Sequence, residues 1–186
     1  MIKDKIRELE SLSSYLNHEE KKIIIKAINF SDLAHKDQTR HSGDPFITHP
    51  IEVAKILTSI NLDASAIAAG LLHDTIEDTI VSINEITETF GSQISELVQG
   101  LTKISKFALK MNKQKLGENY RKLILASSKD LRVILIKLAD RLHNMRTIKF
   151  IKDENKKIDI SMETLEIFSP LAQRLGMKEW QDELED

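Results

Sequence analysis

Apolar residues recur at intervals of three and four positions along most of the chain, the spacing that places them on one face of an α-helix. The alternating apolar and polar pattern of a half-buried strand is absent. Only three prolines and six glycines interrupt the sequence. The pattern therefore predicts an all-α bundle of about ten helices. Those that we can place cover residues 2–14, 18–35, 50–60, 63–75, 82–90, 92–102, 117–127, 130–148 and 157–175.

Two segments lack this helical pattern. Residues 36–50 contain Gly43 and two prolines, and residues 105–117 are basic and irregular. Loops on a rigid scaffold often carry binding groups, so both segments are candidates for ligand contact. For residues 105–117, a solvated connector that binds nothing is an equal alternative.

Composition narrows the class of protein. The 186 residues, 41% of them hydrophobic, are enough for a single domain with a real core. The chain has no cysteine, which excludes disulfides and thiolate ligands and fits a reducing compartment. No apolar run approaches the roughly 20 residues that span a bilayer, so we expect a cytoplasmic protein without membrane contact. A net charge of −2 argues against a nucleic-acid partner but allows a local basic pocket for a small anion.

The run LLHDTIEDT, residues 71–79, concentrates ionisable groups directly after an apolar segment. On a helix, His73 would lie above Glu77 and Asp74 above Asp78, so that an imidazole and three carboxylates face nearly the same volume. This crowding of negative charge is costly unless a cation lies within it. The run therefore predicts a metal ion.

Two further ligands come from elsewhere in the sequence. His49 directly precedes a proline at a predicted helix start, and Asp140 interrupts the apolar face of a long predicted helix. A buried carboxylate without a partner is costly, and coordination would remove that cost. With His73 and Asp74 they form a mixed nitrogen and oxygen shell, which suits Mn, Fe, Co, Ni or Zn.

The predicted chemistry is metal-assisted hydrolysis. A bound metal lowers the pKa of its water to about 7 in favourable cases. Glu77 and Asp78 follow the ligands by one turn and are placed to orient that water or to take its proton. A phosphate ester or anhydride is the favoured substrate.

Each of these residues also has a simpler interpretation. Asp140 could form an ordinary ion pair with Arg141, and Glu77 and Asp78 could merely begin a loop. Most histidines pack or cap helices instead of binding metal. We expect that ordinary role for His18, His35, His41 and His143. All the simpler interpretations must hold together for the metal hypothesis to fail.

The order His49, His73-Asp74, Asp140 resembles the HD superfamily of metal-dependent phosphohydrolases. A closer resemblance, over about residues 30–186, is to the hydrolase domain of the RelA/SpoT family, which makes and destroys the alarmones ppGpp and pppGpp in the stringent response. The segments that carry it are RHSGDPFITHPIEVAKIL, AAGLLHDTIEDT, FGSQISELVQGLTKI, ENYRKLILASSKDLRVILIKLADRLHNMRTI and ETLEIFSPLAQRLGM. HDTIEDT combined with KLADRLHNMRT is highly specific.

The resemblance implies an HD-type hydrolase domain over residues 1–186, without a synthetase domain. Its implied activity is hydrolysis of the 3′-pyrophosphate of (p)ppGpp to GDP or GTP and pyrophosphate, with one Mn²⁺ ion. The metal ligands implied by position are His49, His73, Asp74 and Asp140. Glu77 and Asp78 match the family's water-activating pair. Arg40 matches a residue that stacks on guanine, and Asn144 and Thr147 match residues that contact the nucleoside.

The sequence departs from the family at one position of the RHSGDP loop. His41 stands where Lys is frequent, so a phosphate or base contact there would be weaker or depend on pH. The chain also stops where long members continue into synthetase and regulatory domains. Two other functions fit the same residues: an HD phosphohydrolase for a different nucleotide, and a nucleotide-sensing module without turnover.

Overall fold

The computed structural model describes residues 2–108 and 130–186, and within them the chain forms helices and no strand beyond an isolated bridge between Thr39 and Pro45. The prediction of an all-α fold is confirmed. The α-helices are α1 (Ile2–Leu12), α2 (His18–Ala34), α3 (Thr48–Ser59), α4 (Ala64–Leu72), α5 (Thr75–Asp78), α6 (Ile83–Phe90), α7 (Ser92–Ala108), α9 (Leu131–Arg146), α10 (Glu154–Glu163), α11 (Ser169–Arg174) and α12 (Lys178–Glu185). A 3-10 turn, η1 (Ile148–Phe150), follows α9, and a π-helical turn, η2 (Thr164–Phe168), joins α10 to α11.

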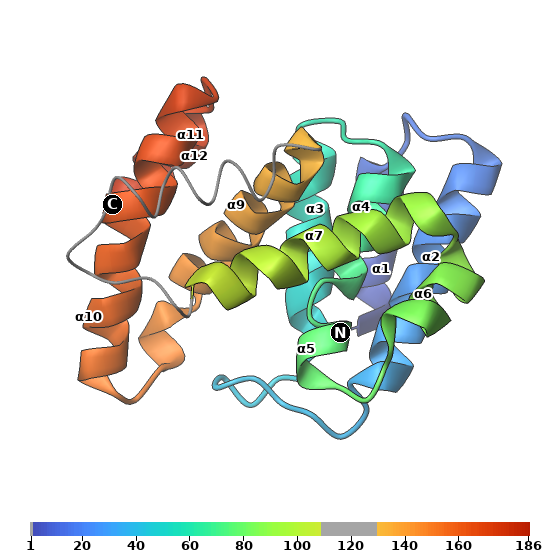
Figure 1. The fold of residues 1–186 in the computed structure, drawn as a ribbon, viewed down its shortest axis with the longest axis horizontal. Helices are drawn as coiled ribbons and strands as arrows, with labels where there is room; N and C mark the ends of the chain where they lie inside the picture. Colours follow the sequence, from blue (N-terminus) through green and yellow to red (C-terminus); the bar gives the residue numbers. More distant parts are fainter. Residues whose placement is uncertain (1, 109–129) are drawn as a thin grey trace.

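Helix α4 lies at the centre of the molecule. It packs against α2, α3, α7 and α9, and all its residues except Ser65 are buried. A helix that is apolar on every side is stable in water only when neighbours surround it. Figure 1 shows α2 and α6 at one end of the molecule and α10, α11 and α12 at the other, with α3, α4 and α9 between them.

Two helix starts are tied together by one arginine. Asp63 caps the N-terminus of α4 and Asp130 caps that of α9, each through its side chain. Arg132 donates hydrogen bonds to both carboxylates, at 2.7 Å to Asp63 and at 2.5 to 3.1 Å to Asp130. The contact ties the start of α4 to the start of α9. His73 directly follows α4, and Asp140 lies on α9.

Helices α3 and α4 approach each other closely at Gly70. A Cβ atom placed on Gly70 would lie 2.6 Å from Cδ1 of Leu57 and 3.7 Å from Cγ1 of Val53, both on α3. No real Cβ tolerates the first of these distances without movement. The absence of a side chain at residue 70 therefore permits this contact between the two helices.

Several helix boundaries differ from the predicted ones. The helix predicted from residue 50 begins at Thr48, which places His49 inside its first turn. The helix predicted over 63–75 ends at Leu72, and the acidic run forms the separate short helix α5. The sequence suggested that His73 and Glu77 lie on one uninterrupted helix, and the structure shows that they do not. Helix α7 continues to Ala108, six residues beyond its predicted end.

The C-terminal part of the chain is more divided than predicted. The single helix expected over 157–175 is α10, η2 and α11, and it begins at Glu154. Helix α12 was not predicted, because only Trp180 and Leu184 of its eight residues are buried and the apolar signal is weak. The helix expected over 117–127 lies outside the described residues, as does most of the segment 105–117. None of the described helices is both long and apolar enough to cross a membrane.

We predict that Gly70→Ala destabilises the fold by up to about 2 kcal/mol. Overpacking against Leu57 costs about 1–3 kcal/mol, and the better helix propensity of alanine returns about 1 kcal/mol. The matched control is Gly100→Ala in α7, where the added Cβ would meet Val133 Cγ2 at the less severe distance of 3.0 Å. Urea unfolding measures both variants. A larger loss for Gly100→Ala would contradict the assignment of the tighter contact to residue 70.

Candidate metal centre and adjoining cavity

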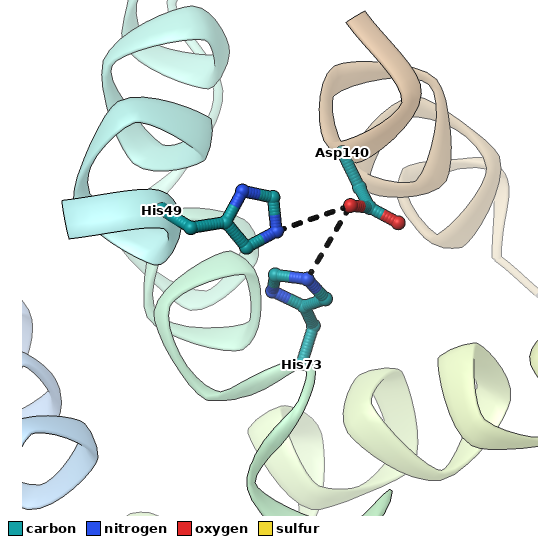
Figure 2. Close-up of side chains that lie close together, drawn as sticks. All are labelled: His49, His73 and Asp140. Atoms are coloured by element: carbon teal, nitrogen blue, oxygen red, sulfur yellow. Dashed lines mark ion pairs between the residues drawn. The ribbon is translucent and has the colours of Figure 1, made fainter. Parts of the chain in front are cut away.

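Three buried side chains from three helices converge on one point. His49 comes from the first turn of α3, His73 from the end of α4 and Asp140 from α9, as Figure 2 shows. One potential ligand atom from each lies within 4.8 Å of the other two. Oδ1 of Asp140 is 3.2 Å from Nε2 of His49 and 3.7 Å from Nε2 of His73.

Asp74 lies beside this group. Its Oδ2 is 3.1 Å from Nε2 of His73 and 3.7 Å from Nε2 of His49, and its side chain is 20% exposed. The four residues predicted as ligands therefore lie together, three of them buried and Asp74 at the edge that water can reach.

The hydrogen bond of His73 defines its tautomer. Nδ1 lies 2.7 Å from the carbonyl oxygen of Gly70, and a carbonyl can only accept, so Nδ1 carries the proton. When the ring is neutral, Nε2 points its lone pair at the cluster. Within the described part of the chain, that atom is buried and has no hydrogen-bond partner. Buried polar atoms are rarely left unpaired, and a metal ion is the partner that fits this donor set of two imidazoles and two carboxylates.

The charges of the cluster favour a cation. Burial opposes ionisation of Asp140, but Lys137 and the two imidazoles outweigh it and hold the pKa of this carboxyl well below its usual range. Burial also opposes the charged forms of Asp74 and His73, yet their mutual attraction lowers the pKa of Asp74 and raises that of His73. Because a metal-binding imidazole is neutral, a cation would displace the proton of His73.

Lys137 is a member of this centre that the sequence did not reveal. Its Nζ lies 2.8 Å from Oδ2 of Asp140, while Oδ1 accepts a hydrogen bond from Nδ2 of Asn144 at 2.7 Å. The alternative that Asp140 pairs with Arg141 is wrong, because Arg141 pairs with Glu163 at 2.6 Å. The spacing of three residues between Lys137 and Asp140 was the available signal.

His143 is the second residue that was missed. Its Nδ1 lies 2.7 Å from Nδ1 of the predicted ligand His49. Burial, with His49 and Arg40 nearby, lowers the pKa of His143 to about 3, so its ring is neutral. The position three residues after Asp140, on the same helix, was the only sequence signal. The other three histidines keep the ordinary roles expected of them. His18 and His41 are exposed, and the ring of His35 is buried and stacks on the ring of Phe46, with the two centroids 4.2 Å apart.

The three residues predicted to bind substrate contact one another. Nη2 of Arg40 donates to Oδ1 of Asn144 at 3.0 Å and to Oγ1 of Thr147 at 3.4 Å. All three line a cavity of about 620 Å³ that also reaches Lys137 and Asp140. This volume is within the range of small-ligand sites. The cavity therefore extends from the predicted base-binding residues to Asp140, one of the predicted ligands.

The acidic pair Glu77 and Asp78 lies on α5, outside the tight ligand group. Both side chains are more than a third exposed, and partial burial together with the charge of Asp74 raises the pKa of each. Their backbone N–H groups donate to the carbonyl of Asp74, at 3.1 and 2.9 Å. This pair is thus held next to a predicted ligand without belonging to the buried cluster.

A side-chain bridge links this acidic turn to the loop that carries Arg40. Nε2 of Gln38 donates to the carbonyl oxygen of Asp78 at 2.9 Å, and Oε1 of Gln38 lies 2.8 Å from Nδ1 of the buried His35. Since an amide oxygen can only accept, His35 is the donor there. The bridge joins the end of α2, the Arg40 loop and α5 in one hydrogen-bonded chain.

Comparison with known proteins identifies the class. The family model described as "HD domain" matches residues 27–178. The match covers well over half of the chain, which therefore belongs to the HD-domain family. The resemblance to the HD superfamily expected from the sequence is confirmed.

Curated relatives narrow the similarity further. The chain is 48% identical over 97% of its length to a GTP pyrophosphokinase of Myxococcus xanthus, and 45% identical over 94% of its length to the bifunctional (p)ppGpp synthase/hydrolase SpoT of Escherichia coli K12. It covers 24% and 25% of those proteins, so it spans about a quarter of their length. The resemblance to the RelA/SpoT family is confirmed.

A solved structure agrees with this placement. The chain superposes with a TM-score of 0.63 and 25% identity on a metazoan ortholog of SpoT, covering 88% of this chain and 85% of that one. That metazoan protein hydrolyses ppGpp and plays a role in starvation responses. The all-α fold described above is thus shared with a SpoT ortholog.

Proposed function

We propose that this chain hydrolyses the 3′-pyrophosphate of (p)ppGpp, with GDP or GTP and pyrophosphate as products, in a reaction that depends on Mn²⁺. The observation that carries the proposal is the position of the cavity. Its wall contains both Asp140 of the metal cluster and the mutually hydrogen-bonded Arg40, Asn144 and Thr147. The names of the relatives, which include a synthase/hydrolase and a ppGpp-hydrolysing ortholog, support the same substrate.

The proposed metal ligands are His49, His73, Asp74 and Asp140. An ion bound there would supply the positive charge that polarises a phosphoryl oxygen and acidifies water. Their proposed division of labour follows the geometry: both imidazoles and Asp140 are buried, whereas Asp74 faces the accessible side.

Glu77 and Asp78 are proposed to transfer a proton from the attacking water to the leaving oxygen. The oxygen of water adds to the phosphorus next to the 3′ oxygen, the P–O3′ bond breaks, and the 3′ oxygen leaves with a proton as a hydroxyl. Glu77 and Asp78 are placed beside Asp74, and their raised pKa values bring them nearer to the range in which a carboxylate exchanges protons with water at neutral pH. Lys137 neutralises part of the charge that accumulates next to Asp140.

Arg40 is proposed to hold the guanine. The guanidinium carbon lies 5.8 Å from the centroid of the Phe46 ring, and Nη2 donates hydrogen bonds to Asn144 and Thr147. A guanidinium plane fixed in this way can stack on an aromatic base. Asn144 and Thr147 then lie within reach of the nucleoside.

Incubation of the purified chain with ppGpp and Mn²⁺ tests the proposal directly. We expect GDP and pyrophosphate in equal amounts, no reaction with EDTA, and loss of turnover in Asp74→Ala, because a ligand carboxylate is removed. Thin-layer chromatography and a pyrophosphate assay measure the products. Unchanged turnover in Asp74→Ala would refute the ligand assignment, and tight binding of ppGpp without product would indicate a sensing module.

Glu77→Gln separates proton transfer from metal binding. We expect the variant to bind Mn²⁺ like the parent chain and to lose about 10²- to 10⁴-fold in kcat, the usual contribution of a general base. Glu88→Gln, the same change at an exposed residue of α6, is the matched control and should keep full activity. If Glu77→Gln instead loses Mn²⁺ in calorimetry, Glu77 is itself a ligand.

Arg40→Ala tests the nucleotide preference. Loss of a stacked cation worth about 1–2 kcal/mol should raise KM for ppGpp roughly 5- to 30-fold with a smaller change in kcat. Arg40→Lys keeps the charge without the planar group and should recover only part of the loss. Steady-state kinetics distinguish these cases. A KM that does not move in either variant favours a different nucleotide substrate.

A further inference from the structure

His143 lies in short contact with the predicted metal ligand His49, and the proposed mechanism gives His143 no role. The Nδ1 atoms of His143 and His49 are 2.7 Å apart, and the two ring centroids are 4.8 Å apart at an angle of 41°. Two ring nitrogens at this distance require one proton between them, because two lone pairs or two N–H groups would repel. One histidine therefore donates and the other accepts.

The environment of His49 decides which one donates. Its Nε2 faces the oxygens of Asp140 and Asp74, at 3.2 and 3.7 Å, where the proposed ion would lie. A ligand nitrogen must offer a lone pair, so the neutral ring carries its proton on Nδ1. Nδ1 of His49 is then the donor, and Nδ1 of His143 accepts.

The two imidazoles of the centre are oriented in different ways. Nδ1 of His73 donates to the backbone carbonyl of Gly70, which is part of the helix and cannot be removed by substitution of a side chain. Among the hydrogen bonds of the described residues, the contact with His143 is the only one at Nδ1 of His49. The ring of His49 is 1% exposed, so water offers little replacement.

Helix α9 holds His143 in a fixed position. Asp140 lies one turn before it on the same helix. The backbone carbonyl of His143 accepts hydrogen bonds from the N–H and the Oγ1 of Thr147, at 3.2 and 3.0 Å. The ligand Asp140 and the group that orients His49 therefore move as one unit.

We propose that His143 is a positioning residue of the metal centre, which accepts a hydrogen bond from Nδ1 of His49 and so keeps Nε2 of His49 directed at the metal. The inference rests on the proposed metal ligands but adds a residue and a role to them. Partners of this kind typically account for 10- to 100-fold in metal affinity.

Metal affinity in matched variants tests the inference. Calorimetric titration of the full chain with Mn²⁺ should show about 10- to 100-fold weaker binding for His143→Ala than for the parent chain. His143→Asn places an amide oxygen near the original Nδ1 and should restore most of the affinity. His18→Ala removes an exposed histidine at the start of α2 and should bind like the parent chain.

Each outcome has one meaning. If the parent chain itself does not bind Mn²⁺, the proposed function fails, whereas a parent chain that binds together with an equally tight His143→Ala overturns the role of His143 alone. If His143→Ala does not fold, as judged by circular dichroism, the folded Asn variant decides: retained affinity supports the inference and a loss of tenfold or more overturns it. Nitrogen-15 NMR of the parent chain loaded with diamagnetic Zn²⁺ should show the His49 proton on Nδ1, and a proton on Nε2 of the loaded chain would contradict the proposal.

Discussion

The buried carboxylate of Asp140 is the constraint around which the centre is arranged. An ionised carboxyl inside a helical core is stable only when its oxygens are fully compensated. Lys137 takes one oxygen, and Asn144 and the two imidazoles share the other. Lys137 and Asn144, one turn before and after Asp140 on α9, therefore stabilise its buried charge whether or not a ligand is bound.

The same compensation connects recognition to chemistry. Nη2 of Arg40 donates to the amide oxygen of Asn144, and the amide nitrogen of Asn144 donates to Asp140. Two hydrogen bonds thus join the residue proposed to meet the base with a proposed metal ligand. An amide that reaches both partners has one allowed orientation, so Asn144 fixes Arg40 relative to Asp140.

The sequence predicted those parts of the fold and site that depend on local contrast. Helix α4 was evident because its apolar run is unbroken. His73 was evident from the crowded charges that follow that run, His49 from its place before a proline at a helix start, and Asp140 because it interrupts an apolar helix face. Helix α12 was missed because only Trp180 and Leu184 mark a buried face.

Lys137 and His143 were missed for a different reason. Each lies three residues from Asp140, a common spacing that becomes informative only when the partner across the helix interface is known. The bridge from Gln38 to Asp78 spans 40 residues of sequence, and its hydrogen bond to a backbone carbonyl leaves no pattern of residue types that could have revealed it.

Gly70 links the packing of two helices to the spacing of two imidazoles. The residue contributes no side chain, so the Leu57 side chain of α3 packs directly against α4, and the rings of His49 and His73 lie 5.2 Å apart between centroids. The carbonyl of Gly70 also orients the ring of His73. A larger residue at position 70 would have to displace Leu57 or separate α3 from α4, and separation would move His49 away from His73.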